Sequence, residues 1–223
     1  MSEKKKGIVD FVMLVDATGS MGPCIGAIKE TLGVLIDEIS GPQSVIRDWR
    51  GRVVGFRDKK VDGSDWFVDN PFVRDVAALR SQVSALDAKG GGDEPESLLE
   101  ALAQVVEAPV SESSQEDDPS KWRGGLVRRA VIVFTDATCH GDMAAIDVVN
   151  QLHAKKMSVF LFGPNEACYE ELMSADKAEW FKLEKAPDYV TAMQTAAKNR
   201  DSFSRIMAAF AKTLSAEIPT EVL

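Results

Sequence analysis

Residues 11–22 read Phe-Val-Met-Leu-Val-Asp-Ala-Thr-Gly-Ser-Met-Gly, and this stretch decides the fold. Five apolar residues run without a break into Asp16, and a turn containing Gly19 follows. A short apolar run that ends in a turn signal predicts a strand buried on both faces, as in parallel sheets. Asp16 and the hydroxyls of Thr18 and Ser20 then lie in the loop at the carboxyl end of this strand, where open α/β sheets place their ligand sites.

Similar apolar runs recur along the chain and alternate with helical patterns. Residues 129–136 form a second run that ends in an aspartate, and residues 158–163 form a third. Further strands are predicted at residues 52–58 and 180–183, a turn at 59–64, and a short antiparallel edge strand at 66–68. Apolar residues at three- and four-residue spacing predict helices within residues 25–39, 76–86, 95–106, 146–152, 166–173 and 189–214. Strands separated by helices of this length predict right-handed crossovers, and hence a doubly wound, mostly parallel α/β sheet flanked by helices.

Length and composition predict one globular domain. The chain has 223 residues, of which 45% are hydrophobic and 27% charged. We expect the domain to span residues 7–217, between a basic tail at 1–6 and a short tail at 218–223. The net charge of −9 argues against binding of nucleic acid or of anionic membranes. No apolar run approaches the roughly 20 residues that a membrane-spanning helix needs.

Residues 111–125 are acidic, serine-rich and almost without apolar residues. This composition predicts a mobile surface loop within the domain. Its position relative to the loop after residue 16, at the opposite end or at a lateral edge of the sheet, is left open by the sequence.

The three cysteines are Cys24, Cys139 and Cys168. Their odd number and wide spacing predict small, partly buried thiols in place of a disulfide framework, which favours a cytoplasmic location. A zinc site would need Cys139 and His140 joined by Cys24 or His153, and adjacent ligands without a second Cys-x-x-Cys pair match zinc poorly.

Three loops carry the residues whose side chains could bind a ligand or take part in a reaction. The first holds Asp16, Thr18 and Ser20; residues 90–96, Gly-Gly-Gly-Asp-Glu-Pro-Glu, form the second, and residues 135–141, Thr-Asp-Ala-Thr-Cys-His-Gly, the third. A doubly wound sheet brings the ends of its strands together. One carboxylate and two hydroxyls form an oxygen donor set that suits Mg²⁺, Mn²⁺ or Ca²⁺ better than zinc.

These loops resemble the metal-ion-dependent adhesion site of the von Willebrand factor A domain family. That pattern is Asp-x-Ser-x-Ser after the first strand, a threonine or aspartate in the second loop, and an aspartate after the fourth strand. The resemblance extends over about residues 7–214 and implies that the cation is held by five residues, with Thr18 in place of the commoner serine. The implied ligands are Asp16, Thr18, Ser20, Asp93 and Asp136.

The second loop departs from the adhesion-receptor form, which has threonine where this chain has Asp93. Gly-Gly-Gly-Asp-x-Pro-Glu, together with Asp-Ala-x-Cys-His-Gly after residue 135, resembles the intracellular branch seen in α-kinase-associated and hemicentin-like A domains. A third carboxylate cancels more of the cation's charge than a hydroxyl does. We therefore expect Asp93 to hold the metal more firmly and to make it a weaker electrophile.

The resemblance implies a non-catalytic module that binds a partner protein through a divalent cation, Mg²⁺ or alternatively Mn²⁺ or Ca²⁺. One coordination position of the metal would remain open for an aspartate or glutamate of the partner. Partner contacts are expected around this position, at Met21, Gly22, Asp58, Cys139 and His140.

Other readings of these residues remain open. Taken singly, the first motif could cap a helix or turn, the glycines could form a joint, and Asp136 could be a turn residue. A phosphatase of the haloacid dehalogenase type would use Asp16 as its nucleophile, but Thr18 stands where such enzymes carry the proton-donating aspartate. A serine hydrolase would need a Gly-x-Ser-x-Gly turn, which Ser20 lacks. A structural domain of the same family without a functional metal is the third alternative.

Overall fold

The computed structural model describes residues 7–42, 44, 46–92, 94–140, 142–183 and 191. Its sheet contains β1 (Gly7–Asp16), β2 (Ile46–Phe56), β3 (Phe67–Asp69), β4 (Val127–Phe134), β5 (Met157–Gly163) and β6 (Ala178–Lys182), in the order β3-β2-β1-β4-β5-β6. All neighbours pair in parallel except the edge strand β3, which runs antiparallel to β2. The predicted mostly parallel sheet with one short antiparallel edge strand is therefore confirmed.

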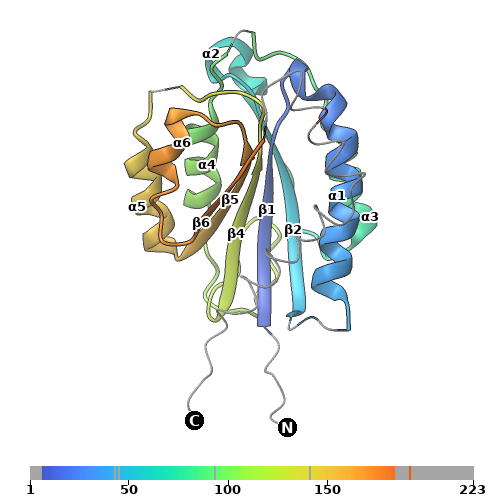
Figure 1. Ribbon diagram of the computed structural model, residues 1–223. Helices are drawn as coiled ribbons and strands as arrows, with labels where there is room; N and C mark the ends of the chain where they lie inside the picture. The colour runs from blue at the N-terminus through green and yellow to red at the C-terminus, as the bar shows by residue number, and fades with distance from the viewer. Residues whose placement is uncertain are drawn as a thin grey trace.

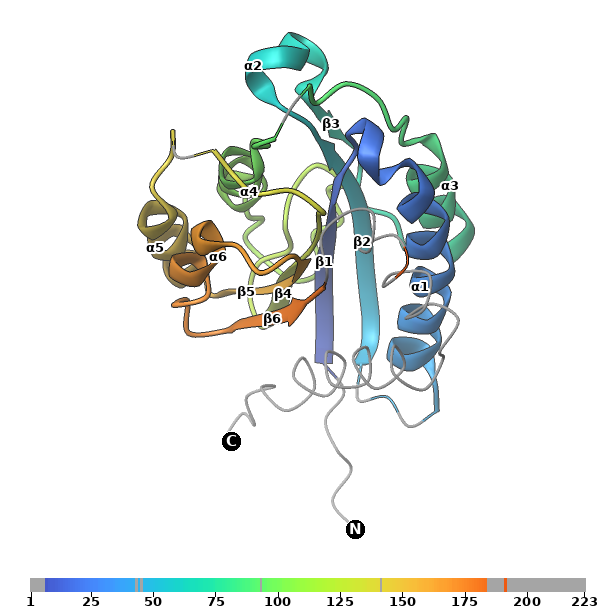
Figure 2. The same cartoon turned by 45° about the horizontal axis from the view of Figure 1, so that its top comes forward.

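Helices cover both faces of the sheet (Figures 1 and 2). One face is covered by α1 (Gly22–Ser40) and α3 (Val76–Ala85), and the other by α4 (Leu98–Glu107), α5 (Ala145–Lys155) and α6 (Ala167–Leu172). The short helix α2 (Lys59–Asp62) lies beyond the carboxyl ends of the strands, at the top of Figure 1. Two 3₁₀ turns, Gly19–Met21 and Gly63–Trp66, complete the set. Within the described residues, no helix is both long and apolar enough to span a membrane.

The central strand β1 explains the unbroken apolar run that opens the sequence. Alternate side chains of a strand point to opposite faces. Phe11, Met13 and Val15 pack on the side of α1 and α3, whereas Val12 and Leu14 pack on the side of α4, α5 and α6. Both faces are buried, so the polar alternation of a half-exposed strand is absent.

Two predicted boundaries are wrong because of contacts distant in sequence, and one predicted turn has a different local structure. β2 begins at Ile46, six residues earlier than the predicted residue 52, because partners elsewhere in the chain bury Arg50. The helix expected to open at Pro95 begins at Leu98, because the residues before it pair with the loop after β4. The predicted turn at residues 59–64 forms α2 and the start of a 3₁₀ turn. Apart from Thr191, which is helical, the predicted helix at 189–214 lies outside the described residues, as do the end of the domain at 217 and both tails.

The segment at residues 111–125 is a loop that lies largely at the surface, as predicted, but its ends are anchored in the protein interior. Trp122 and Arg123 are fully buried, and the Trp122 indole donates a hydrogen bond to the Val105 carbonyl. Arg123 also binds Asp10 near the beginning of β1, so the segment packs at the amino end of the sheet, opposite Asp16. This contact joins residues 113 positions apart, which no local pattern reveals.

The path of the chain places a switch point at the carboxyl end of β1. The chain passes from β1 through α1 to β2 on one side of it, and later returns to β4 on its other side. Crossovers that leave a strand in opposite directions open a crevice at its carboxyl end. Asp16 is the last residue of β1, and Asp136 follows the adjacent strand β4 by two residues.

Candidate metal centre

Asp16 is completely buried, and both of its carboxylate oxygens are held in place. Oδ1 accepts hydrogen bonds from the Thr18 amide at 3.0 Å and from Thr18 Oγ1 at 2.7 Å. Oδ2 accepts a hydrogen bond from Thr135 Oγ1 at 2.8 Å, across from the neighbouring strand end. All three donors are neutral groups, and they fix the orientation of the carboxylate.

The structure brings four of the five predicted ligands into one chain of oxygens. Thr18 Oγ1 lies 3.2 Å from Ser20 Oγ, and Ser20 Oγ donates to Asp136 Oδ1 at 3.1 Å. In an octahedral Mg²⁺ site with bonds of about 2.0–2.1 Å, neighbouring ligand oxygens are about 2.8–3.0 Å apart. The spacing and the oxygen-only chemistry of the set therefore fit a hard divalent cation. Ser20 is exposed, so this chain of oxygens reaches the surface.

The fifth predicted ligand, Asp93, lies outside the described residues. Within the part of the chain that the structure describes, no three or more His, Cys, Asp or Glu side chains are grouped closely enough to hold a metal ion. The described part of the predicted set contains two carboxylates and two hydroxyls.

Asp16 lacks a basic counterpart among the residues that the structure describes. Asp16 forms no ion pair with a lysine or arginine among the described residues. Burial raises the pKa of Asp16 to about 6; the hydrogen bonds from Thr18 oppose this rise and repulsion by Asp136 adds to it. The buried Cys24 thiol has its pKa raised to about 12, by burial and then by repulsion from Asp136 and Asp16. The shifts in both pKa values show that negative charge is concentrated around Asp16, and no lysine or arginine among the described residues pairs with this carboxylate.

Arg57 is the basic residue next to this loop, and it binds carbonyl oxygens. Its guanidinium donates to Ala17 O at 3.1 Å, Asp65 O at 2.5 Å and Asp87 O at 2.6 Å. Arg57 therefore connects three loops through hydrogen bonds to their backbone carbonyls.

The three glycines of the second loop allow that loop to approach Thr18 closely. Gly90, Gly91 and Gly92 have φ values of +70°, +86° and +62°, a region that side chains disfavour. A Cβ on Gly91 would lie 2.5 Å from Thr18 Cγ2, closer than atoms can pack. The Gly91 amide is held by a hydrogen bond to Asp62 Oδ2 at 2.9 Å. The glycines therefore allow the backbone of the second loop to pack closely against Thr18, which is a more specific role than the joint considered from the sequence.

Glu96 is a residue of this loop that the sequence did not assign to the site. It is only 4% exposed, and its Oε2 has no hydrogen-bond partner among the described residues. Burial, followed by repulsion from four aspartates, raises the pKa of Glu96 to about 9; those aspartates are Asp16, Asp58, Asp62 and Asp136. Its position, three residues after Asp93 in the quoted motif, is the signal that could have singled it out.

Backbone pairing joins the second loop to the third. The Glu96 amide donates to Thr138 O at 2.9 Å, and the His140 amide donates to Glu96 O at 2.9 Å. Further along the third loop, the Tyr169 hydroxyl donates to the Ala137 carbonyl. The segment after Asp136 is therefore held from both sides.

The residues predicted to contact a partner differ in how far they are exposed to solvent. Met21 and Asp58 are buried; Asp58 Oδ1 accepts from the Lys60 amide at 2.8 Å and lies 3.1 Å from His140 Nε2. Gly22 is exposed, and the His140 side chain is 12% exposed. Of the predicted rim, Gly22 and His140 are thus the residues that solvent reaches to a useful degree.

The prediction that the cysteines form no disulfide is wrong. Cys139 and Cys168 are joined by a disulfide that ties the third loop to α6, and Cys24 is free and buried. These residues are 29 positions apart, and the fold brings them together. His153, one of the two residues considered as a third zinc ligand, accepts a hydrogen bond at Nε2 from the Asp176 amide at 2.9 Å.

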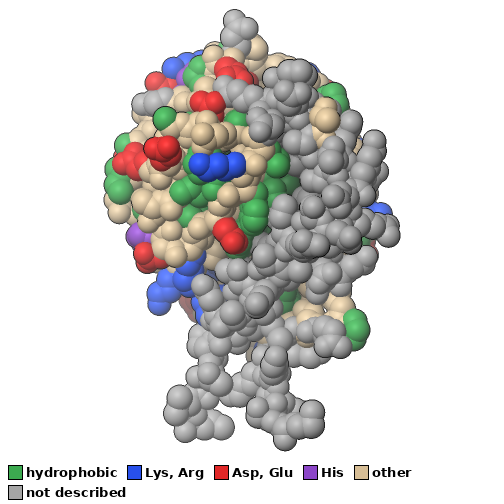
Figure 3. Space-filling model, viewed as in Figure 1, with side chains coloured by type: hydrophobic (Ala, Val, Ile, Leu, Met, Phe, Trp, Pro, Cys, Tyr) green, Lys and Arg blue, Asp and Glu red, His purple; other side chains and the backbone are tan. Residues whose placement is uncertain are grey.

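The outside of the molecule carries a surplus of acidic groups. Figure 3 shows acidic side chains over the face viewed there, several of them near the end where α2 lies, with fewer basic ones among them. This agrees with the net charge of −9 for the whole sequence. A net negative charge favours the approach of cations over that of anions.

Comparisons with known proteins agree with the fold. Residues 10–201 match the family described as von Willebrand factor A domain. Among solved structures, one of proximal thread matrix protein 1 from the mussel byssus matches with a TM-score of 0.58 and 15% identity, covering 88% of this chain and 48% of that one. A second structure of the same protein gives 0.57 and 13%, with 92% and 47% covered.

The present chain thus spans about half the length of the mussel protein, and at such identities the likeness shows the fold alone. No curated protein matches the sequence. The family match covers most of the chain and the sheet has the corresponding order, so the chain belongs to the von Willebrand factor A domain family.

Proposed function

We propose that this domain is a non-catalytic module that binds a partner protein through a divalent cation, Mg²⁺ or alternatively Mn²⁺ or Ca²⁺. Asp16, Thr18, Ser20 and Asp136 would hold the cation, and Asp93 would complete the set as the resemblance implies. One observation carries the proposal: Asp16 is completely buried with only neutral donors around it, at one end of a chain of oxygens that leads to the surface.

The residues of the chain have distinct roles in this proposal. Thr18 and Thr135 orient the Asp16 carboxylate, and Ser20 carries the oxygen set outward to solvent. The Gly91 backbone packs against Thr18 and restricts access from that side. When bound, the cation would supply the missing positive charge and an open coordination position for an exposed Asp or Glu of the partner.

We further propose that Asp93 strengthens cation binding at the expense of affinity for the partner carboxylate. Its identity as aspartate, within Gly-Gly-Gly-Asp-x-Pro-Glu, also favours the intracellular branch of the family. Isothermal titration of Mg²⁺ into the wild type and Asp93→Thr tests the first point. Weaker binding by the variant is expected, and equal or tighter binding would overturn it.

A pull-down in Mg²⁺ and in EDTA tests the interaction itself. We expect a partner to be captured by the wild type in Mg²⁺, and to be lost both in EDTA and with Asp16→Ala. Asp142→Ala is a matched control, because Asp142 is an exposed aspartate of the third loop that pairs with Lys60. Equal capture of the partner in EDTA would contradict cation dependence.

Two alternatives make different predictions. A phosphatase that uses Asp16 would hydrolyse a generic phosphoester and lose this activity in Asp16→Ala. Against it, Asp16 is fully buried with both oxygens hydrogen-bonded, and Thr18 occupies the position of the proton donor. A structural domain without a functional metal would show no response to Mg²⁺ in thermal unfolding.

The remaining expectations concern partners and location. The acidic surface favours a protein partner over nucleic acid or an anionic membrane. The disulfide between Cys139 and Cys168 removes the cysteine pattern as an argument for a cytoplasmic location, which stays a prediction.

A further inference from the structure

Glu96 presents an unexplained buried carboxyl beside the candidate metal centre. Only 4% of the residue is exposed, and Oε2 lacks a hydrogen-bond partner among the described residues. A buried polar atom left without a partner costs free energy, and a native fold tolerates it when some further group satisfies it.

The carboxyl of Glu96 lies on the same side of Gly91 as the side chain of Thr18. A Cβ on Gly91 would lie 2.7 Å from Glu96 Oε1 and 2.5 Å from Thr18 Cγ2, so both side chains crowd the same space. Thr18 in turn donates to Asp16 Oδ1 at 2.7 Å. The Glu96 side chain is therefore directed at the first loop of the centre.

The backbone holds Glu96 in this position. Its amide and carbonyl both pair with the third loop, at Thr138 and His140, a few residues after Asp136. Among neighbouring acids, Asp58 accepts from the Lys60 amide, and Asp62 accepts from the Gly91 amide. These two carboxylates already accept hydrogen bonds from backbone amides, and neither can donate one to Glu96 when ionised.

We propose that Glu96 belongs to the cation centre and accepts a hydrogen bond from a water molecule bound to the metal. This inference rests on the proposed function, because it requires a cation held by Asp16, Thr18, Ser20 and Asp136. Among the residues that the structure describes, no three acidic side chains lie close enough together to bind one ion directly. A water molecule between the metal and the Glu96 carboxyl is consistent with this spacing. Glu96 then orients the water and adds to the negative charge that retains the cation.

Titration calorimetry with Mn²⁺ as the probe tests this role in three variants. Glu96→Gln keeps the size of the side chain and removes its charge, and Glu96→Asp keeps the charge on a shorter side chain. Glu94→Gln is the matched control, since Glu94 is an exposed residue of the same loop. We expect the dissociation constant to rise about 10–100-fold in both Glu96 variants, and to stay within about twofold in the control.

The outcomes separate this inference from the function on which it rests. If the wild type binds no Mn²⁺, the proposed function fails. If the wild type binds and Glu96→Gln binds equally well, only the role of Glu96 fails. Wild-type affinity in Glu96→Asp would also overturn it, since charge alone would then suffice. If Glu96→Gln does not fold, Glu96→Asp decides between these outcomes.

Discussion

Asp10 and Asp16 lie on the same strand and the same face of the sheet, and both are completely buried. They are six residues apart, or about 20 Å along an extended strand. Their surroundings differ in one respect, which is the source of the positive charge that each carboxylate requires.

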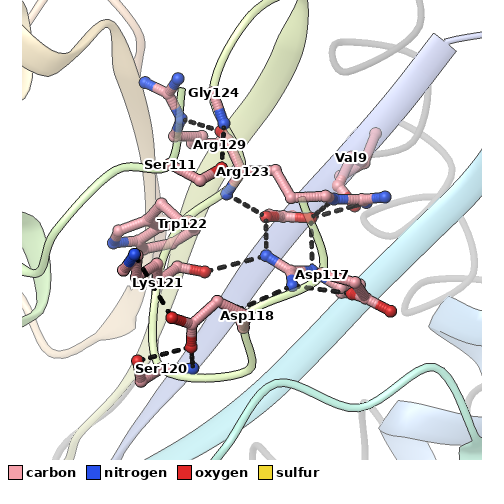
Figure 4. A network of polar contacts seen from close by, with 12 residues as sticks. Val9, Ser111, Asp117, Asp118, Ser120, Lys121, Trp122, Arg123, Gly124 and Arg129 are labelled. Carbon is pink, nitrogen blue, oxygen red and sulfur yellow. Dashed lines mark hydrogen bonds and ion pairs between the residues drawn. The ribbon is translucent and has the colours of Figure 1, made fainter. Parts of the chain in front are cut away.

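At the amino end, Arg50 and Arg123 neutralise Asp10, and Figure 4 shows Arg123 within this network of polar contacts. Arg50 Nη2 binds Asp10 Oδ2 at 2.8 Å, and Arg123 Nε binds Asp10 Oδ1 at 2.8 Å. The Arg123 amide donates to the same carboxylate at 2.8 Å. Arg50 also binds the carbonyls of Asp118 and Lys121, so this cluster anchors the acidic segment of residues 111–125.

At the carboxyl end, Asp16 receives hydrogen bonds from Thr18 and Thr135 alone, as far as the structure describes its partners. The fold is thus able to bury arginines against an aspartate, as it does at Asp10. No arginine is placed at Asp16 among the described residues, and under the function proposed above a cation from solution would supply the missing charge.

The largest effect should come from removing the two carboxylates in turn. Asp10→Asn leaves Arg50 and Arg123 buried without a full counter-charge, which we expect to cost about 3–5 kcal/mol of unfolding free energy. Asp16→Asn removes an uncompensated buried charge, so in EDTA we expect no loss of stability, or a gain. Urea unfolding in EDTA measures both. Equal destabilisation by the two substitutions would break the contrast between the ends.

The next effect concerns how the carboxyl end is held together. There, the disulfide between Cys139 and Cys168 ties the third loop to α6. Reduction should lower the unfolding free energy by about 2–4 kcal/mol. Cys168→Ala should already lack this stabilisation and should not respond to the reductant. A wild type that is equally stable with and without reductant would contradict this expectation.

The pH dependence of stability should also reveal the uncompensated charge. The pKa of Asp16 is raised from 3.8 to about 6, so the folded protein keeps this proton to a higher pH than the unfolded chain does. Without metal, the protonated Asp16 carboxyl contributes its full share to the unfolding free energy below about pH 4. As the pH rises to about 6 this contribution is lost, and the unfolding free energy falls by up to about 3 kcal/mol. We expect the difference between wild type and Asp16→Asn in EDTA to follow this course. A difference that does not change between pH 4 and 6 would argue against it.

The parts of the molecule that depend on local pattern could be predicted from the sequence. The apolar run before Asp16 fixed the position of the central strand, because burial on both faces leaves a continuous apolar signature. The hydroxyls at Thr18 and Ser20 follow at alternate positions of one turn, and Asp136 ends a similar run, so these ligands could be named in advance.

The parts that depend on contacts between distant residues could not be predicted. The acidic composition of residues 111–125 suggested solvent exposure, yet Arg123 is buried by Asp10, 113 positions away. Glu96 was passed over because its burial results from pairing with residues 138–140, which only the folded chain brings alongside. The disulfide was missed for the same reason.

Thermal unfolding in Mg²⁺ and in EDTA tests most directly whether a cation supplies the charge that Asp16 lacks. At 100 times its dissociation constant, a ligand of the folded state adds about 2.7 kcal/mol, which in a chain of this size raises the midpoint by about 5–10 °C. We expect this rise in the wild type and its loss in Asp16→Asn, with Asp142→Asn behaving as the wild type. An unchanged midpoint of the wild type at millimolar Mg²⁺, Mn²⁺ and Ca²⁺ would contradict a cation site at Asp16.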